Sequence, residues 1–166
     1  MEFGIGAEGV DAAVVVTGAS GLNMKAAQLA QVLADSDDAV VLNVDSDVDA
    51  GSLSLAALVD PFANEPRLAA LWQAAVGTGG TTLGDRASDA LLAGSLHAFP
   101  VLSALDGAGL VGKVLALRRT SLDAIGGFAA LEPYLGEDME LARRLRAAGM
   151  RVAVAPGVAR SLAHGR

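Results

Sequence analysis

Two aspartates at alternate positions are the strongest candidates for metal chemistry in this sequence. Asp45 and Asp47 stand in the stretch VLNVDSDV, directly after an apolar run at residues 39–44. That run predicts a strand, and open α/β sheets place their ligands at the carboxyl ends of strands. A turn beginning at Asp45 could bring both carboxylates onto one Mg²⁺ or Mn²⁺. The same spacing occurs at Asp35 and Asp37, so a metal site and a solvated turn both remain open.

A second acidic pair lies where the last helix is expected to begin. Glu137 and Asp138 open the stretch EDMELARRLRAAG, and carboxylates at a helix start are favoured by the helix dipole, so a capping role is one interpretation. Asp138 also precedes the predicted buried stripe, at helical spacing that puts it on the same face. A carboxylate directed towards a sheet could accept a proton from a hydroxyl group. The stripe is formed by Leu141, Ala142, Leu145 and Ala148.

Other chemical patterns are weaker. The stretch VVVTGASG resembles a dinucleotide-binding turn, but LNMKAA follows it where a further glycine would open the helix. Tyr134 has no lysine four residues later, which removes a reductase pair. His97 and His164 stand alone, without the spacing of metal ligands. We therefore expect structural or exposed roles for both histidines on spacing alone.

Composition excludes several classes of function. The chain has 166 residues, a net charge of −7 and no cysteine, which indicates one domain without disulfides or thiolate chemistry. It has no block of lysine or arginine that could follow a phosphate backbone, so nucleic acid is not an expected partner. No apolar run reaches the ~20 residues that a membrane helix needs. The start lacks the positive charge of a signal peptide.

The elements expected to position these groups alternate along the chain. Strands are predicted at residues 12–18, 39–44, 67–76, 112–119 and 150–156, and helices at residues 22–35, 86–98, 120–126 and 137–149. The first strand, helix and strand form a βαβ pattern, which favours a parallel sheet with residues 39–44 at its centre. Pro100 is expected to break the helical stretch at residues 86–98. The fold class is therefore α/β.

Four stretches in order resemble blocks of glycosyltransferase families 2 and 21, especially ceramide glucosyltransferase-like enzymes, including the bacterial branch associated with hopanoid biosynthesis. They are LNMKAAQLA, VLNVDSDVD, GKVLALRRTSLDAIGGF and LGEDMELARRLRAAGMRVAVAP, and the resemblance covers residues 13–160. It implies a GT-A fold, with a mostly parallel sheet flanked by helices, and an inverting hexosyltransferase. It further implies a nucleotide-diphosphate sugar donor, a lipid hydroxyl as acceptor, and Mg²⁺ or Mn²⁺.

The resemblance also implies roles for individual residues. Asp45 and Asp47 match the aspartate motif that holds the donor and the metal. Asp138 matches the acidic residue assigned as catalytic base, with Glu137 as its catalytic neighbour. Asn23 and Lys25 match an Asn-x-Lys element near the donor. The stretch SLHAFP is similar to a histidine-containing stretch on the acceptor side, which points to His97.

Departures from the family pattern concern both ends. Only eleven residues precede AAVVV, so the first β-α unit of the family, with its aspartate near the nucleotide base, is not matched. The arginine-tryptophan motif near the acceptor is not matched either. The sequence thus predicts a partial GT-A domain at residues 12–160 between tails at 1–11 and 161–166, with weak or no activity alone. The family acts at the cytoplasmic face of membranes, while this chain itself is expected to be soluble and cytoplasmic.

Two alternatives remain. In a haloacid dehalogenase-like phosphatase, Asp45 and Asp47 would follow a strand, Lys113 would steady a phosphoryl group, and a later acidic pair would hold Mg²⁺. That later pair should end a strand, whereas Glu137 and Asp138 are expected to open a helix. The other alternative is a GT-A remnant without catalysis, in which the carboxylates serve only as caps.

Overall fold

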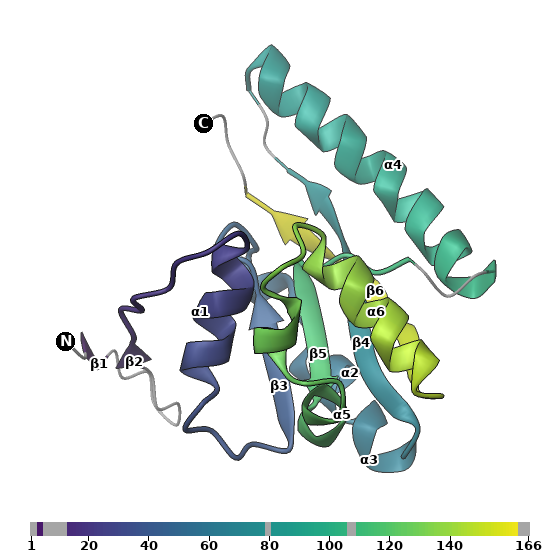
Figure 1. Cartoon of the computed structure of the whole chain (residues 1–166). Coiled ribbons are helices and arrows are strands. Elements are labelled where there is room, and N and C mark those ends of the chain that lie inside the picture. The colour runs from purple at the N-terminus through teal and green to yellow at the C-terminus, as the bar shows by residue number, and fades with distance from the viewer. Residues whose placement is uncertain (1–2, 5–12, 79–80, 106–108, 163–166) are drawn as a thin grey trace.

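The computed structural model describes residues 3–4, 13–78, 81–105 and 109–162 (Figure 1). Its strands are β1 (Phe3–Gly4), β2 (Ala13–Val14), β3 (Val40–Val44), β4 (Leu68–Gly77), β5 (Val114–Arg118) and β6 (Arg151–Ser161). Its α-helices are α1 (Met24–Val32), α2 (Leu55–Val59), α3 (Pro61–Asn64), α4 (Leu83–Leu105), α5 (Arg119–Ala124) and α6 (Glu137–Ala147), with 3₁₀ turns η1 (Ala50–Ser52) and η2 (Phe128–Leu131). Of the expected tails, residues 1–2, 5–11 and 163–166 lie outside the described part, while Ser161 belongs to β6.

The main sheet is mixed, so the prediction of a mostly parallel sheet was wrong. Its strand order is β3-β5-β4-β6. Strand β5 runs antiparallel to both of its neighbours, and only β4 and β6 pair in parallel. Strand β3 therefore lies at an edge and not at the centre. A sheet flanked by helices is nevertheless present, which confirms the α/β class.

Residues 13–18 do not form the buried strand that was expected at residues 12–18, and residue 12 lies outside the described part of the chain. Only Ala13–Val14 is extended in a ladder, and it pairs with Phe3–Gly4 away from the main sheet. Val15 and Val16 are exposed. A β-branched run forms a buried strand only where a neighbouring strand accepts its hydrogen bonds. Without that pairing, the predicted βαβ unit does not form and the parallel arrangement built on it is lost.

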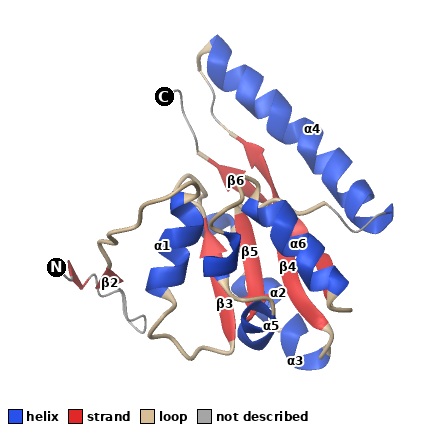
Figure 2. Ribbon diagram, viewed as in Figure 1, coloured by secondary structure: helices blue, strands red, loops and turns tan. Residues whose placement is uncertain are grey.

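Two layers of helices cover the two faces of the sheet. Alternate residues of a strand point to opposite faces, and in β5 Leu115 and Leu117 pack on one side while Val114 and Ala116 pack on the other. Helices α1, α5 and α6 cover the first face, and α2 and α3 cover the second. Helix α6 crosses in front of the sheet and α2 lies behind it (Figure 2).

The helix α6 follows the predicted pattern closely. Leu141, Ala142 and Leu145 are buried against the sheet, and Glu140 pairs with Arg144 at 2.7 Å. The helix ends at Ala147, one residue earlier than the stripe implied, so the expected burial of Ala148 was wrong.

Helix α4 continues through Pro100, so the expected break was also wrong. The helix covers 23 residues. A proline inside a helix removes one hydrogen bond at a cost of about 3 kcal/mol, but Leu96 and Phe99 pack against the core beside it. Packing thus holds this segment helical. No helix in the described part of the chain is sufficiently long and apolar to cross a bilayer.

Candidate active site

The ends of all four strands of the main sheet meet at one rim. Val44 pairs with Val114, so the carboxyl end of β3 lies beside the start of β5. Gly77 pairs with Ser161, so the carboxyl ends of β4 and β6 also lie together. The turn after β3 carries both aspartates of the first motif. The residues just before β5 therefore stand next to that turn.

Lys25 connects the two acidic motifs at this rim. Its Nζ donates a hydrogen bond to Asp45 Oδ1 at 2.7 Å and another to the carbonyl of Gly112 at 3.3 Å. The same nitrogen lies 4.0 Å from Glu137 Oε1. The side chains of Lys25 and Asp45 are about one-third exposed, at 36% and 30%. Carboxylates separated by more than 90 residues in the sequence are thus in reach of one ammonium group that also contacts water.

Asn23 fixes the position of the helix that carries Lys25. Its Oδ1 accepts from the backbone N–H of Ala26 at 2.9 Å, which caps α1. Its Nδ2 donates to Glu137 Oε2 at 2.8 Å and to the carbonyl of Tyr134 at 2.7 Å. The residue is buried. Asn23 therefore joins the start of α1 to the start of α6, and direct contact with a donor remains a prediction for this residue.

Asp138 faces the same rim from the first turn of α6. Its Oδ2 accepts from the N–H of Gly112 at 3.3 Å, and its Oδ1 accepts from the N–H of Met139 at 2.8 Å. A Cβ placed on Gly112 would lie 3.4 Å from Asp138 Cβ and 3.6 Å from Lys25 Nζ. Gly112 thus separates the lysine from the carboxylate, and the predicted inward direction of Asp138 is confirmed.

Burial is the main influence on the protonation of Asp138. It raises the pKa of this carboxyl, and the negative charge of Glu137 acts in the same direction. The N–H groups of Met139 and Gly112 and the charge of Lys25 lower it, but they do not cancel the effect of burial. A carboxylate with a raised pKa is a stronger proton acceptor than an exposed aspartate.

Asp47 has different partners from Asp45. Its Oδ2 accepts hydrogen bonds from Lys113 Nζ and, at 3.0 Å, from Ser161 Oγ. Burial by itself raises the pKa of Asp47, but these two hydrogen bonds and the charge of Lys113 outweigh it, so the pKa lies below its ordinary value. Asp47 is therefore a stable anion paired with a partly buried lysine.

The acidic groups of the rim fit a divalent cation only if the substrate supplies most of the ligands. No group of three or more histidine and acidic side chains that could hold a metal occurs among the described residues. Mg²⁺ is commonly held by one or two carboxylates together with phosphate oxygens and water. Asp45 is partly exposed and offers one such carboxylate. The donor set therefore fits a cation that binds together with a diphosphate, and a metal role for Asp47 remains a prediction.

An open groove of about 590 Å³ runs beside Asp45. It lies between residues 15–17 and α1 on one side and the end of β3 on the other. The groove has both polar and apolar lining residues, and they are Val15, Val16, Thr17, Lys25, Gln28, Leu29, Val32, Asn43, Val44, Asp45 and Ser46. Lys25 would match an anionic group, and the exposed Val15 and Val16 would match a flat apolar group.

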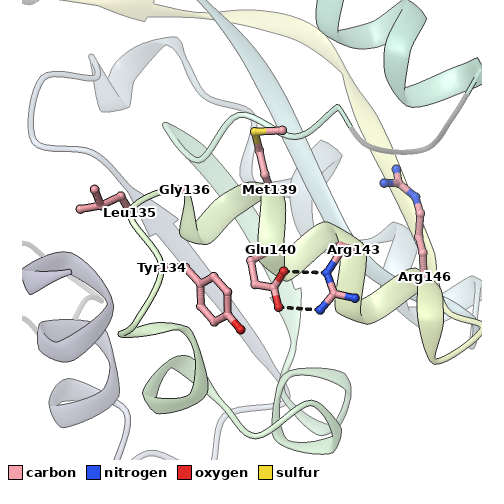
Figure 3. Close-up of a pocket in the computed structure, with 7 residues that line it drawn as sticks. All are labelled: Tyr134, Leu135, Gly136, Met139, Glu140, Arg143 and Arg146. Carbon is pink, nitrogen blue, oxygen red and sulfur yellow. Dashed lines mark hydrogen bonds and ion pairs between the residues drawn. The ribbon is translucent and has the colours of Figure 1, made fainter. Parts of the chain in front are cut away.

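A second pocket of about 460 Å³ lies along the outer face of α6 (Figure 3). Leu135 and Met139 are exposed at its edge. Figure 3 shows Glu140 joined to Arg143 by two hydrogen bonds, of 2.6 and 2.7 Å, and Glu140 also accepts from Arg144. These hydrogen bonds lower the pKa of Glu140 to about 2. Most of the surface that lines this pocket is apolar. The pocket lies beside the turn of helix that carries Asp138.

The two histidines are not placed at this rim by the structure. His97 lies on α4 with an exposed side chain, and α4 packs mainly against β4 and β6. His164 lies outside the described residues. A role for His97 on the acceptor side remains a prediction.

Sequence reasoning missed two groups that the fold brings to the rim, Gly112 and Ser161, and considered Lys113 only in the phosphatase alternative. Gly112 contacts both Lys25 and Asp138, and Ser161 and Lys113 bind Asp47. Gly112 and Lys113 begin one of the blocks that carried the family resemblance, GKVLALRR, which was the available signal. Nothing local to Ser161 distinguishes it from other serines, because its contact with Asp47 spans 114 residues.

Comparison with known proteins identifies the family. No curated protein matches the chain. A sequence model described as glycosyl transferase family 21 matches residues 8–165, which is nearly the whole chain. The match agrees with the resemblance found in the four sequence blocks and with a rim that gathers acidic groups around a lysine. The chain therefore belongs to glycosyl transferase family 21.

Proposed function

We propose that this glycosyltransferase moves a sugar from a nucleotide-diphosphate donor to a hydroxyl acceptor with inversion at the anomeric carbon. The observation that carries the proposal is the position of Gly112. Its carbonyl accepts from Lys25, which binds Asp45, and its N–H donates to Asp138. The ammonium group of Lys25 on the donor side and the carboxylate of Asp138, which can act as a base, therefore lie on either side of Gly112.

The groove beside Asp45 is the proposed donor site. Lys25 supplies positive charge for the diphosphate, and Val15 and Val16 offer an apolar surface for the nucleotide base of the donor. Residues 15–17 belong to no strand of the main sheet, so no ladder of strand hydrogen bonds holds this wall. We expect weak donor binding by the chain alone for that reason.

Asp138 is the proposed general base. The acceptor hydroxyl attacks the anomeric carbon as the bond to the diphosphate oxygen breaks, and its proton passes to Asp138. The charge of Glu137 and the burial of Asp138 both favour proton acceptance. Lys25 stabilises negative charge on the leaving side. Attack from the side opposite the leaving group gives inversion.

Asp45 is the proposed attachment point for Mg²⁺ or Mn²⁺. A cation bound there with the phosphates would neutralise charge on the leaving group. The proposal is supported by the exposed fraction of the Asp45 side chain and by its place in the groove.

A lipid alcohol is the proposed acceptor class. The apolar pocket on the outer face of α6 lies beside the turn that carries Asp138, and Leu135 and Met139 extend its apolar surface into solvent. Asp138 is not among the described residues that line this pocket, so an amphiphile resting its chain there would have to pass its hydroxyl around the start of α6 to meet Asp138. The position of the acidic pair disfavours the phosphatase alternative, because Glu137 and Asp138 open α6 and do not end a strand.

The test is transfer by the full chain from a panel of UDP-, GDP- and CDP-sugars to a detergent-dispersed long-chain alcohol, with Mg²⁺ or Mn²⁺ present. The expected result is a glycoside of inverted configuration, observed by NMR, that disappears in Asp138→Asn. A retained configuration, or equal turnover by that variant, would refute the mechanism.

The non-catalytic alternative is tested by ligand-dependent melting. A ligand that binds only the folded state raises Tm. If none of the nucleotide sugars raises Tm with Mn²⁺ present, and no transfer is observed, the chain is a scaffold without a donor site.

A further inference from the structure

We propose that Asp47 is a positioning residue that anchors the turn after β3 to the end of β6. Of the two aspartates, only Asp45 then meets the donor and its cation. This inference rests on the proposed donor site at Asp45. It divides the two aspartates of the D-x-D motif into one ligand-facing residue and one internal anchor.

The side chain of Asp47 is engaged by two buried or partly buried groups. Ser161 is 1% exposed, and its Oγ donates to Asp47 Oδ2 at 3.0 Å. Lys113 Nζ donates to the same oxygen and lies 3.4 Å from Ser161 Oγ. The three side chains form one network that joins the turn after β3, the start of β5 and the end of β6. Ser161 is too deeply buried to meet a ligand.

Backbone hydrogen bonds also attach the turn after β3 to the end of β6. The N–H of Leu162 donates to the carbonyl of Asp47 at 2.6 Å, and the N–H of Asp49 donates to the carbonyl of Arg160 at 2.8 Å. Val48 and Ser161 form a bridge. The whole turn is therefore attached to the final residues of β6.

Asp45 faces a different set of neighbours. Its carboxylate pairs with Lys25 and lines the groove, whereas Asp47 is not among the described residues that line it. Residues two apart share a face in a regular strand, but the turn that follows Val44 abolishes that relation. The two carboxylates therefore serve opposite sides of the turn.

Rotation of Asp47 towards a cation would break this network. It would leave the ammonium of Lys113 and the hydroxyl of Ser161 without their shared carboxylate, and unpaired groups in such surroundings are costly. Strand β3 is an edge strand that pairs only with β5. The turn after it needs an anchor on another strand, and Asp47 supplies one. A fixed turn holds Asp45 in place for the donor.

The decisive experiment compares four variants of the full chain, with UDP and Mn²⁺ as the probe. They are D45N, D47N, S161A and the double variant D47N/K113Q, which replaces the ion pair by a neutral amide pair. Affinity is measured by titration calorimetry, and Mn²⁺ occupancy is measured by EPR.

An anchor and a metal ligand predict different affinities. As an anchor, D47N weakens UDP–Mn²⁺ binding about tenfold, the double variant recovers to within about threefold of wild type, and S161A weakens binding about threefold. As a metal ligand, Asp47 would be needed as a carboxylate, so the double variant would bind no better than D47N and S161A would bind as wild type does. Either of those two results overturns the inference.

A hydrogen-exchange measurement without ligand tests this inference separately from the proposed function. Hydrogen exchange at the amides of Asp49 and Leu162 should be about tenfold faster in D47N and S161A and unchanged in D45N. Equal exchange in D47N and wild type refutes the anchor. If wild type binds none of UDP, GDP and CDP in the presence of Mn²⁺, the proposed donor site fails and the exchange result alone decides the anchoring role. S161A is the milder change if D47N does not fold.

Discussion

Replacing Asp138 by asparagine should slow sugar transfer and make the stability of the protein, relative to wild type, rise with pH. The amide has the same shape as the carboxylate but only one acceptor oxygen, so it can keep one of the two hydrogen bonds that Asp138 accepts, from the N–H of Gly112 at 3.3 Å and from that of Met139 at 2.8 Å. It cannot take a proton from the acceptor. A general base contributes about 10²- to 10⁴-fold to a rate. The turnover of D138N should therefore fall by about 10²- to 10⁴-fold, equivalent to about 3 to 5 kcal/mol in the barrier.

The stability effect follows from the direction of the pKa shift. Burial raises the pKa of Asp138 in the folded state. Its contribution to stability is therefore complete below the unfolded pKa of about 3.8 and is lost as pH rises through the folded pKa. At pH 7 the ionised carboxylate opposes folding, and asparagine removes that cost. Asparagine also loses one hydrogen bond at every pH, so the raised pKa predicts the change with pH: the stability of D138N relative to wild type should be greater at pH 7 than near pH 3.8.

Two measurements and one control test this reasoning. Single-turnover transfer gives the chemical rate, and urea unfolding at pH 7 and pH 4 gives the stability difference. D123N is the matched control, because Asp123 is an exposed residue of α5 whose pair is Arg119. It should leave the rate unchanged. Wild-type turnover in D138N would show that Asp138 is a capping residue and not the base, and a stability difference that is the same at pH 7 and pH 4 would contradict the raised pKa.

Three further predictions concern other parts of the structure. K25M should weaken donor binding about tenfold in calorimetry, because Lys25 is the ammonium shared by Asp45 and Glu137; K25R should retain most of the affinity, and tighter binding by K25M would mean that the lysine competes with the donor. E140Q should destabilise the fold at pH 7, because hydrogen bonds from two arginines hold the pKa of Glu140 at about 2. This difference from wild type should diminish in urea unfolding as pH falls from about 4.5 towards 2, and a constant difference would contradict it. L145A should cost about 2 to 5 kcal/mol in urea unfolding because Leu145 is fully buried, whereas L135A should change stability by less than about 0.5 kcal/mol; equal losses would place the core elsewhere.

Local sequence signals predicted most of the elements but not their pairing. The strands predicted at residues 39–44 and 67–76 form as Val40–Val44 and Leu68–Gly77, and α1 and α6 form where the apolar periodicity indicates helices. These sequence patterns reflect interactions between residues that are only a few positions apart in the chain. The direction of β5 and the edge position of β3 depend on contacts with distant strands, and the failed strand at residues 15–18 lacks a partner of that kind.

The acidic site was predictable in part for the same reason. Asp45 and Asp138 were recognised because each follows a local signal, a strand end or a helix start. Gly112 and Ser161 were not, since a glycine and a serine acquire their roles only from what packs beside them.

The sequence by itself determined the family, the α/β class and the residues that carry charge into the site. Only the tertiary structure decided that Lys25 joins the two acidic motifs, and that Asp45 and Asp47, two residues apart, have separate partners. The physical reason is range. Periodicity and helix capping act over a few residues, whereas the contacts between Lys25 and Gly112 and between Asp47 and Ser161 span 87 and 114 residues and exist only when the sheet brings its strand ends to one rim.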